Sequence, residues 1–508
     1  MAWHGAGVEG DLCRRLDAKL RTTACSLKGW AASKVGSVRL QLAMARVVIL
    51  ELDVAQESRA LSPMELALRS DLKVMTLGLA SLARTIVRQK SRCRFLSEGD
   101  ANTRFFHLQN CHRWRKNYLH SFPHEGVLFS TDEAKSEAVF DYFNGVFGSR
   151  FQRSHSIDLE RLDLPRLDLS DLAAEFTDDE ITRAVMETPA DRAPGPDGFT
   201  GRFFWAAWPV IKADVCAVFR ALWAQDWCSF YLVNAANMVL LRKKDDLQGQ
   251  RDYQPISLMH SFSKLFSKAL ALRLSPFMDR LVHANQTAFI HGRRIHDNFR
   301  SVQLYCRWLH AGRRPCILLK IDIAKAFDSV SWMFLLQVLE RFGFPLACRD
   351  WVSAMLSSAS TKVLVNGRLG RRICHARGVR QGDPLSPLLF VLVMEVLSSL
   401  IREADRRGLL TPLPGEHFRH RLAVYADDVV LFLAPSPSDF TCIKSILELF
   451  AGASGLLTNV DKCMLSPIRC SEEQIAVVHA VFPCQLSPFP CRYLGAPLSL
   501  RRLSRADE

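Results

Sequence analysis

Two short apolar runs that end in acidic residues constrain the fold of this chain more than any other feature of its sequence. The first run, CILLKID, places Asp322 at the end of a predicted strand. The second, LAVYADDVVLFLA, places Asp427 and Asp428 at the turn of a predicted hairpin. Adjacent carboxylates between apolar strands are costly unless they are exposed or neutralised by cations. If the strand packs beside the hairpin, the three carboxylates converge on one sheet edge and can hold two divalent ions roughly 4 Å apart.

Such a site suits nucleotidyl transfer. Paired divalent ions would acidify a primer 3′-hydroxyl and neutralise the triphosphate and its pyrophosphate leaving group. Carboxylate and phosphate oxygens favour Mg²⁺, with Mn²⁺ as a substitute. Each piece alone has a plainer interpretation, because an acid after a strand often caps a helix and a YxDD tetrapeptide arises by chance. The segment RGVRQGDPLSPLLF, at residues 377–390 between them, is too long and unusual for chance.

The composition predicts a basic globular chain. Its 508 residues are 48% hydrophobic, and 66 lysines and arginines against 52 acids give a net charge of +14, which favours a polyanion such as nucleic acid. The 15 cysteines show no paired spacing, so we expect them to be reduced and mostly buried. His107, Cys111 and His112 lack a second pair for a tetrahedral zinc site. We expect no export signal and no membrane span, since the apolar stretch 385–401 carries Glu395 in its middle.

The N-terminal part is predicted to be mainly helical. Residues 1–120 contain a leucine-rich stretch that lacks proline, and we interpret them as a helical extension. A basic run with interleaved aromatic residues follows between positions 84 and 116. It suits a phosphate backbone with stacked bases, and equally a solvated helix face with ordinary core aromatics.

Two capping boxes predict helix starts farther along. They pair Ser130 with Glu133 and Thr177 with Glu180. Between these helices, residues 150–172 are polar and contain proline, so we interpret them as a linker. Beyond residue 190 the pattern becomes mixed, with short β-rich runs between long helical ones.

The motifs DIAKAFD, RGVRQGDPLSP and YADD, in this order, resemble motifs A, B and C of reverse transcriptases, specifically those of LINE-type (non-LTR) retrotransposons. The resemblance covers most of the chain. The segments similar to the family's fingers are APGPDGF, RDYQPISL and QTAFIHGRRIHDN. Farther on, SGLLTNVDK resembles motif D and YLGAPL the primer grip. The segment KSRCRFLSEGDANTRFFH resembles the one that joins endonuclease to polymerase in plant LINE elements.

The resemblance implies an α+β right-hand polymerase, with fingers and a palm whose antiparallel sheet is backed by helices. Its expected divisions are a helical basic N-terminal extension, a helix and linker region, the fingers, the palm and the start of a thumb, at residues 1–120, 121–189, 190–300, 301–500 and 501–508. We expect the thumb to be largely missing. Nor do residues 1–190 show the pattern of an endonuclease.

The resemblance also assigns roles to single residues. It makes Asp322 and Asp427 the principal metal ligands, with Asp428 beside them. Phe327 falls where the family has the aromatic residue that excludes a ribose 2′-hydroxyl, although a core phenylalanine after a strand is the alternative. Gln381 matches a motif B residue that approaches the incoming nucleotide and the template base.

Further residues are assigned in the same way. Gly382, beside Gln381, would permit close backbone approach. Lys462 matches the motif D lysine proposed to protonate the leaving pyrophosphate. Lys243 lies where the fingers reach the triphosphate, and Tyr425 is the motif C tyrosine beside the substrate. Gln254 stands where the family usually has arginine, and an amide cannot supply the bidentate cationic fork that grips phosphate.

The favoured function is therefore RNA-directed DNA polymerase, with an RNA template, a DNA primer and dNTPs as partners, no membrane, and nuclear action implied by the family alone. The rival is a catalytically weakened or inactive transposon remnant that still binds nucleic acid. A splicing maturase, which uses the same fold, fits the motif wording less well. The sequence specifies neither the template RNA nor the oligomeric state.

Overall fold

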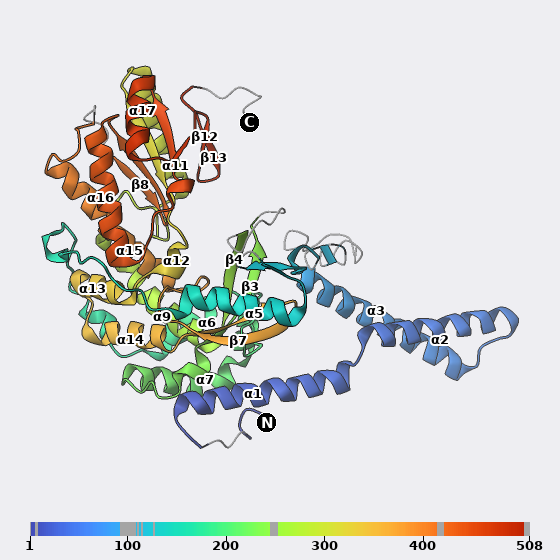
Figure 1. Ribbon diagram of the computed structural model, residues 1–508. Helices are drawn as coiled ribbons and strands as arrows, with labels where there is room; N and C mark the ends of the chain where they lie inside the picture. Colours follow the sequence, from blue (N-terminus) through green and yellow to red (C-terminus); the bar gives the residue numbers. More distant parts are fainter. Residues whose placement is uncertain are drawn as a thin grey trace.

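The N-terminal region of the computed structural model is helical, as predicted (Figure 1). The structure describes residues 2–5, 9–91, 108, 111–112, 115–124, 127–243, 252–413 and 421–501. The helices of this region are α1 (Leu12–Trp30), η1 (Ala31–Val35), α2 (Val38–Ser58) and α3 (Pro63–Ser91). α2 and α3 form a hairpin that projects from the rest of the molecule. α1 packs on the body, where Trp3 and Lys19 both bind the Asp214 carboxylate at 2.7 Å.

The segment 150–172 was predicted to be a linker, and that prediction is wrong. Its short helices are η3 (Leu159–Arg161) and η4 (Ser170–Ala173). The backbone of Leu167 donates to the Phe342 carbonyl at 3.1 Å, which fastens the segment to the body. Its buried leucines join the main core, and they are Leu159, Leu162, Leu164, Leu169 and Leu172. The segment is irregular in backbone but part of the hydrophobic core.

The two predicted capping boxes have different outcomes. Thr177 and Glu180 form a reciprocal box at the start of α6 (Asp178–Met186), as predicted. The first prediction is wrong by one residue: α5 (Asp132–Phe143) is capped by Thr131, whose hydroxyl accepts from the backbone of Ala134. Ser130 therefore lies one position before the cap.

A four-stranded sheet forms the middle of the molecule, in the order β4-β3-β6-β7. Its strands are β3 (Ala235–Arg242), β4 (Tyr253–Met259), β6 (Ser360–Val365) and β7 (Arg368–Cys374). β3 runs antiparallel to β4 and parallel to β6. α5 and the π-helical turn η2 (Asn144–Gly148) cover one face, where Val139 and Phe147 pack against Met238 and Val363. The helices around it are α7 (Gly201–Trp223), α8 (Phe230–Val233), α9 (Ser261–Leu274), η6 (Ser275–Phe277), α10 (Met278–Leu281) and α14 (Leu346–Ser357).

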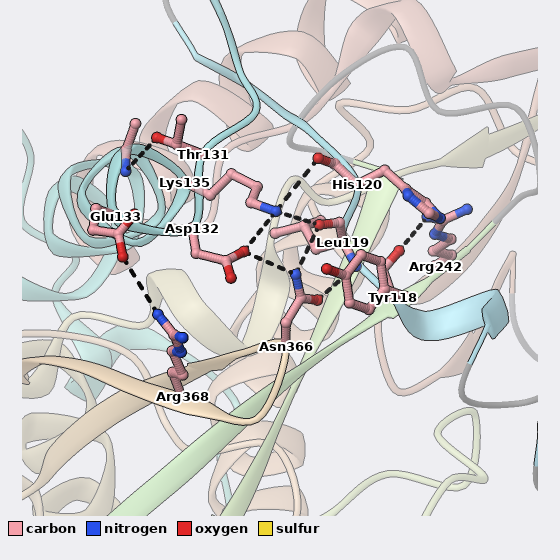
Figure 2. A network of polar contacts seen from close by, with 11 residues as sticks. Tyr118, Leu119, His120, Thr131, Asp132, Glu133, Lys135, Arg242, Asn366 and Arg368 are labelled. Carbon is pink, nitrogen blue, oxygen red and sulfur yellow. Dashed lines mark hydrogen bonds and ion pairs between the residues drawn. The ribbon is translucent and has the colours of Figure 1, made fainter.

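A short segment before the small hairpin of β1 (Phe122–His124) and β2 (Val127–Phe129) is fastened to this sheet. Figure 2 shows the contacts. The buried ammonium of Lys135 donates to the Leu119 carbonyl at 2.9 Å and pairs with Asp132 at 2.9 Å. Asn366, in the turn between β6 and β7, bonds both the N–H and the carbonyl of Leu119. Arg242 donates to the Tyr118 carbonyl at 2.7 Å. These contacts tie the end of the N-terminal region to the end of the sheet at which β3 stops and β6 turns into β7.

A five-stranded sheet, in the order β11-β10-β5-β9-β8, forms the other main layer. Its strands are β5 (Cys316–Ile321), β8 (Leu422–Tyr425), β9 (Asp428–Leu433), β10 (Met464–Ile468) and β11 (Gln485–Leu486). β5 lies between β10 and β9 and is antiparallel to both, whereas β11 is parallel to β10. Successive side chains point to opposite faces, so Leu319 and Leu431 enter one core while Leu318 and Phe432 enter another.

Helices bury both faces of the five-stranded sheet, which explains the nearly continuous apolar strands. The elements that complete this part are α11 (Ile295–Ala311), α12 (Ala326–Ser329), α13 (Trp332–Phe342), α15 (Ser386–Arg406), α16 (Pro437–Ser454), η7 (Val460–Lys462), α17 (Glu472–Val481), β12 (Cys491–Tyr493) and β13 (Ala496–Leu498). α15 is the apolar stretch noted in the sequence, and its buried Glu395 pairs with Arg402 at 2.8 Å.

Two expectations about the chain as a whole can be compared with the structure. Among the described residues, no helix combines the length and apolarity that crossing a bilayer requires. The described cysteines are free, and most of them are buried or half-buried, as expected.

Candidate active site

Strand pairing brings the predicted carboxylates to one end of the five-stranded sheet. Ile321 pairs with Val429 in the antiparallel register, so Asp322, the next residue, lies across from Asp428. Tyr425 pairs with Asp428 and closes the hairpin, which leaves Asp427 in the two-residue turn. The predicted strand, the predicted hairpin and their adjacency are therefore all present. Half-buried Tyr425 lies at the end of β8.

The carboxylates share an electrostatic environment. The pKa of Asp427 is raised, first because neighbouring protein limits its hydration and then because the Asp428 and Asp322 carboxylates repel its charge. Lys243 opposes this rise in pKa. Lys320 pairs with Asp428 at 3.4 Å, a neighbour that the sequence pattern did not single out. Crowded carboxylate oxygens of this kind are hard donors that suit divalent cations.

The three carboxylates are neighbours, but their side chains do not converge on a single point that a metal ion could occupy. Within the described ranges, no three histidine, cysteine or acidic side chains converge as a metal-binding group. His107 of the incomplete zinc set lies outside the described residues, as does the greater part of the basic run between positions 84 and 116.

Asp322 is fixed through its backbone to the segment that resembles motif D. Its carbonyl accepts from the Asn459 N–H at 2.8 Å, and its own N–H donates to the Cys463 sulfur at 3.5 Å. Lys462 lies between these two residues, in η7, with its side chain exposed. The predicted lysine is thus carried on a segment that is bonded directly to the predicted metal ligand.

The hairpin turn is held by a residue that sequence reasoning did not assign. The side-chain oxygen of buried Gln286 accepts from the N–H of Ala426 at 3.1 Å and from that of Ala288 at 3.0 Å. Asn298 donates to the Val424 carbonyl at 2.9 Å and accepts from the Tyr493 hydroxyl at 2.7 Å. The segment QTAFIHGRRIHDN, noted only as a family resemblance, therefore supports the turn that carries Asp427.

Replacing Gln286 by leucine is expected to slow turnover with little change in primer–template affinity. The change leaves two backbone N–H groups without their acceptor, at a cost of roughly 1–3 kcal/mol each, and loosens the turn beneath Asp427. Steady-state primer extension, giving kcat and KM, is the measurement. Gln303→Leu is the matched control, because Gln303 is also buried and bonded to backbone, at Ser499. Equal kcat losses in both variants would contradict a positioning role for Gln286.

The segment that resembles motif B packs between α12 and β4. Phe327, in α12, is half-buried and stacks on Phe390 with ring centroids 4.4 Å apart, and its carbonyl accepts from Val379 at 2.7 Å. The Gln381 carbonyl accepts from the Ser257 N–H at 3.1 Å. Gly382 has a φ of +106°, and a Cβ there would lie 2.9 Å from the Ser257 carbonyl oxygen. Gly382 thus lies against the backbone of β4, and its approach to a nucleotide stays a prediction.

The residue assigned to the triphosphate, Lys243, is exposed just beyond the end of β3. Its charge opposes the rise in pKa that burial causes at both Asp427 and Asp328, so Lys243 acts electrostatically on the site. Gln254, on β4, is also exposed, and it pairs with Leu241 of β3. Residues two apart on a strand share a face, so Gln254 and Lys243 lie on the same side of the sheet.

Asp328 is a buried acid near the site that the sequence analysis left without a role. Burial raises its pKa to about 7, against the opposing charges of Lys325 and Lys243. Lys325 has a left-handed backbone, and its ammonium lies 4.6 Å from the centroid of the Tyr142 ring. In the sequence, Asp328 is only the second acid of DIAKAFD. Nothing in that motif shows whether this acid is buried or exposed.

Comparison with known proteins identifies the class. Residues 241–498, just over half of the chain, match the model of the family "Reverse transcriptase (RNA-dependent DNA polymerase)". The chain belongs to this family. Its curated relatives further define it as a reverse transcriptase domain of the non-LTR, LINE type.

Two of these relatives match over 395 residues at 29% identity. The transposon TX1 uncharacterized 149 kDa protein of Xenopus laevis aligns with 73% of this chain and 28% of its own length. The Pol polyprotein from the type-2 retrotransposable element R2DM of Drosophila melanogaster aligns with 76% of this chain and 34% of its own length. The chain thus spans about a third of either relative. An uncharacterized mitochondrial protein of Arabidopsis thaliana, AtMg01250, is 42% identical over 67 residues, which are 13% of this chain and 55% of that protein.

Proposed function

We propose that this chain extends a DNA primer with dNTPs on an RNA template by two-metal nucleotidyl transfer. One observation carries the proposal: the β5–β9 register sets Asp322 across from Asp428, beside the turn that holds Asp427. An adjacent pair of acids and a third acid distant in sequence, all at one sheet end, are the donor set that this reaction uses. The family membership and the net charge of +14 support nucleic acid as the substrate.

In the proposed site, Asp322, Asp427 and Asp428 hold Mg²⁺, or Mn²⁺ in its place. Bound there, the ions would supply charge neutralisation and acidify the primer hydroxyl. The five-stranded sheet and its helices would be the palm, at residues 301–500, and residues 190–300 the fingers. The raised pKa of Asp427 supports cation binding, because a cation relieves the repulsion that causes the rise.

The remaining residues bind and orient the substrate. Lys243 reaches the triphosphate. Gln381 and the backbone of Gly382 approach the incoming nucleotide and the template base. Phe327 limits the space at the sugar. Lys462 donates a proton to the leaving pyrophosphate, a role suited to an exposed ammonium on the segment bonded to Asp322.

Primer extension tests the function. The purified chain, poly(rA)/oligo(dT), dTTP and Mg²⁺ are expected to give extension products that EDTA abolishes and added Mg²⁺ restores. Binding of the primer–template without extension, in Mg²⁺ and in Mn²⁺ alike, would instead establish the second candidate function, a nucleic-acid-binding remnant. The observation that favours this candidate is Gln254, an exposed amide on the face that carries Lys243.

Gln254→Arg is expected to lower the KM for dTTP about tenfold, because a charged hydrogen bond to phosphate contributes roughly 1.5 kcal/mol or more. The planar guanidinium can bind two phosphate oxygens at once. Gln254→Lys is the matched control, since it adds the charge without the fork and should give a smaller gain. The same KM in all three proteins would remove position 254 from the triphosphate site.

Phe327→Ala is expected to admit ribonucleotides. Loss of the ring opens space for a 2′-hydroxyl, and the preference for dTTP over UTP should fall about 10- to 200-fold, the range for one small group in a fitted pocket. Incorporation of the two nucleotides is compared in the extension assay. Phe327→Tyr keeps the ring and should keep the preference. Unchanged discrimination in the alanine variant would return Phe327 to the role of a core residue packed on Phe390.

The similarity to the Arabidopsis protein supports a narrower proposal, that the chain comes from a plant LINE-type element. The segment at residues 90–107 that suggested plant origin lies almost wholly outside the described residues. Nuclear action remains a proposal from the family.

A further inference from the structure

The α2–α3 hairpin is an extension that no other part of the described structure supports. Its helices pack along each other, and Arg69 of α3 donates to the Asp53 carboxylate of α2 at 2.6 Å. Neither helix packs extensively on any other element of the described ranges. The hairpin therefore projects beyond the body (Figure 1), and the sides of α2 and α3 that do not contact each other are open to a partner.

An apolar row runs along the exposed side of α2. Its members are four, three and seven residues apart and so lie on one side of the helix, and they are Leu40, Met44, Val47 and Val54. These residues are 54–60% exposed. A row with this spacing is typical of a helix that packs against another helix. α3 leaves this row uncovered.

A second apolar row runs along α3. Its members are four, seven and seven residues apart, and they are Met64, Leu68, Met75 and Leu82. These residues are 39–84% exposed. Burial of such side chains is the main driving force of protein association. Both helices of the hairpin thus present apolar side chains to the solvent.

The two rows lie on one face of the hairpin. On α2, Val48 is exposed and follows buried Ala45 by three positions. On α3, Met75 is exposed and follows half-buried Leu72 by three positions. In an antiparallel helix pair, residues with the same offset from the helix–helix contact point to the same side. Val48, one turn after Met44, therefore joins the two rows, and the rows with Val48 form the hairpin face.

The charges around the hairpin face do not suit an anionic partner. Arg46 and Lys73 follow the same contact residues by one position instead of three, which places them on the opposite side of the hairpin. Glu51 and Asp71, by contrast, border the face. A phosphate backbone or an anionic lipid surface would select the side with the basic residues. A mainly apolar centre with few charges is instead typical of the core of a protein–protein interface.

The size of the hairpin face suits a stable interface. α2 has 21 residues and is therefore about 32 Å long, and two adjacent helices are about 20 Å wide. The face thus covers roughly 600 Å², close to the ~800 Å² per partner of a standard protein–protein interface. That area is also at the upper end of the range for the largest apolar patch of a monomer.

We propose that a second copy of this chain covers the hairpin face. The face has the symmetry of a two-fold contact, because an antiparallel helix pair has an approximate two-fold axis perpendicular to the plane of its helices. Two hairpins packed face to face form a four-helix bundle, in which the apolar rows of one copy fit between those of the other. This dimer goes beyond the proposed polymerase function and does not depend on it.

Sedimentation of the full chain, treated with nuclease and followed over a hundredfold range of concentration, tests the dimer. The mass should rise to about twice the 57.4 kDa of one chain. The dimer should persist in about 0.5 M NaCl, because salt screens charged contacts and does not weaken apolar ones. A monomer throughout the range overturns the proposal, and so does a dimer that dissociates in salt.

Val47→Glu and Met75→Glu test the face, with one change on each helix. Glutamate is a good helix former, so the helix content and the melting temperature of the monomer should be unchanged. The dissociation constant of the dimer should rise at least 100-fold, since each change occurs twice in a two-fold interface. Leu77→Glu is the matched control, because Leu77 is 73% exposed on α3 but lies four residues after Lys73, on the charged side. A dimer that persists in Val47→Glu and Met75→Glu, or that is lost equally in Leu77→Glu, overturns the proposal.

Flotation with vesicles of phosphatidylcholine and phosphatidylserine tests a lipid surface as the alternative occupant. A chain that is monomeric in solution and floats with vesicles, and whose flotation is lost in Val47→Glu, would assign the face to lipid and overturn the dimer. Neither measurement uses primer or nucleotide. A chain that extends no primer can therefore still form the dimer, and failure of the proposed function is distinguishable from failure here.

Discussion

Asp427→Asn is expected to reduce primer extension roughly 1000-fold or more, because a carboxylate that holds a catalytic cation contributes several kcal/mol and each 1.36 kcal/mol is tenfold in rate. The fold should survive. Asp427 is exposed in the two-residue turn, and the backbone bond from Ala426 to Gln286 is untouched by the change.

The stability of this variant gives an independent check. The pKa of Asp427 is raised in the folded chain, so its ionisation at neutral pH opposes folding, and asparagine removes that opposition. The melting temperature at pH 7 should therefore be equal to or slightly above that of the wild type. Asp350→Asn, an exposed acid on α14, is the matched control and should keep full activity. Extension by Asp427→Asn within tenfold of the wild type would remove Asp427 from the catalytic site.

The core of the candidate site could be predicted because its signals are local. Apolar β-favouring residues before Asp322 and on both sides of Asp427 predicted β5 and the hairpin of β8 and β9, and all three strands are present. The start of α13 has a signal of the same local kind, since the hydroxyl of its N-cap residue, Ser331, accepts from the Phe334 N–H. The pairing of β5 with β9 has no local signal, and the sequence analysis stated it only as the condition under which the three carboxylates converge.

The features that the sequence did not reveal depend on long-range contacts. Gln286 holds the N–H of Ala426 across 140 positions, and no local pattern marks a glutamine for that role. Residues 150–172 look like a linker because they are polar and contain proline, yet most of their leucines are buried in the main core.

Gly378→Ala is expected to destabilise the chain and to impair extension together. Gly378, in the motif B segment, has a φ of +78°, and a Cβ there would lie 2.5 Å from the carbonyl oxygen of Asp328. Its N–H donates to Val330 at 2.8 Å, and its carbonyl accepts from the Trp332 indole at 2.7 Å, so the loop cannot move away without losing both bonds. The left-handed backbone costs roughly 1–2 kcal/mol for alanine, and the overpacking adds about 1–3 kcal/mol.

Gly408→Ala separates these two costs. Gly408 has a φ of +71°, but a Cβ there would meet nothing within 4 Å, so the variant carries the backbone strain without the clash. Thermal unfolding should therefore rank the wild type above Gly408→Ala and Gly408→Ala above Gly378→Ala. Primer extension below the melting range should fall only in Gly378→Ala, since displacing Asp328 also moves the adjacent Phe327. Equal melting temperatures for the two alanine variants would show that α12 moves away from the added methyl group at little cost. The motif B segment would then not fix the position of α12.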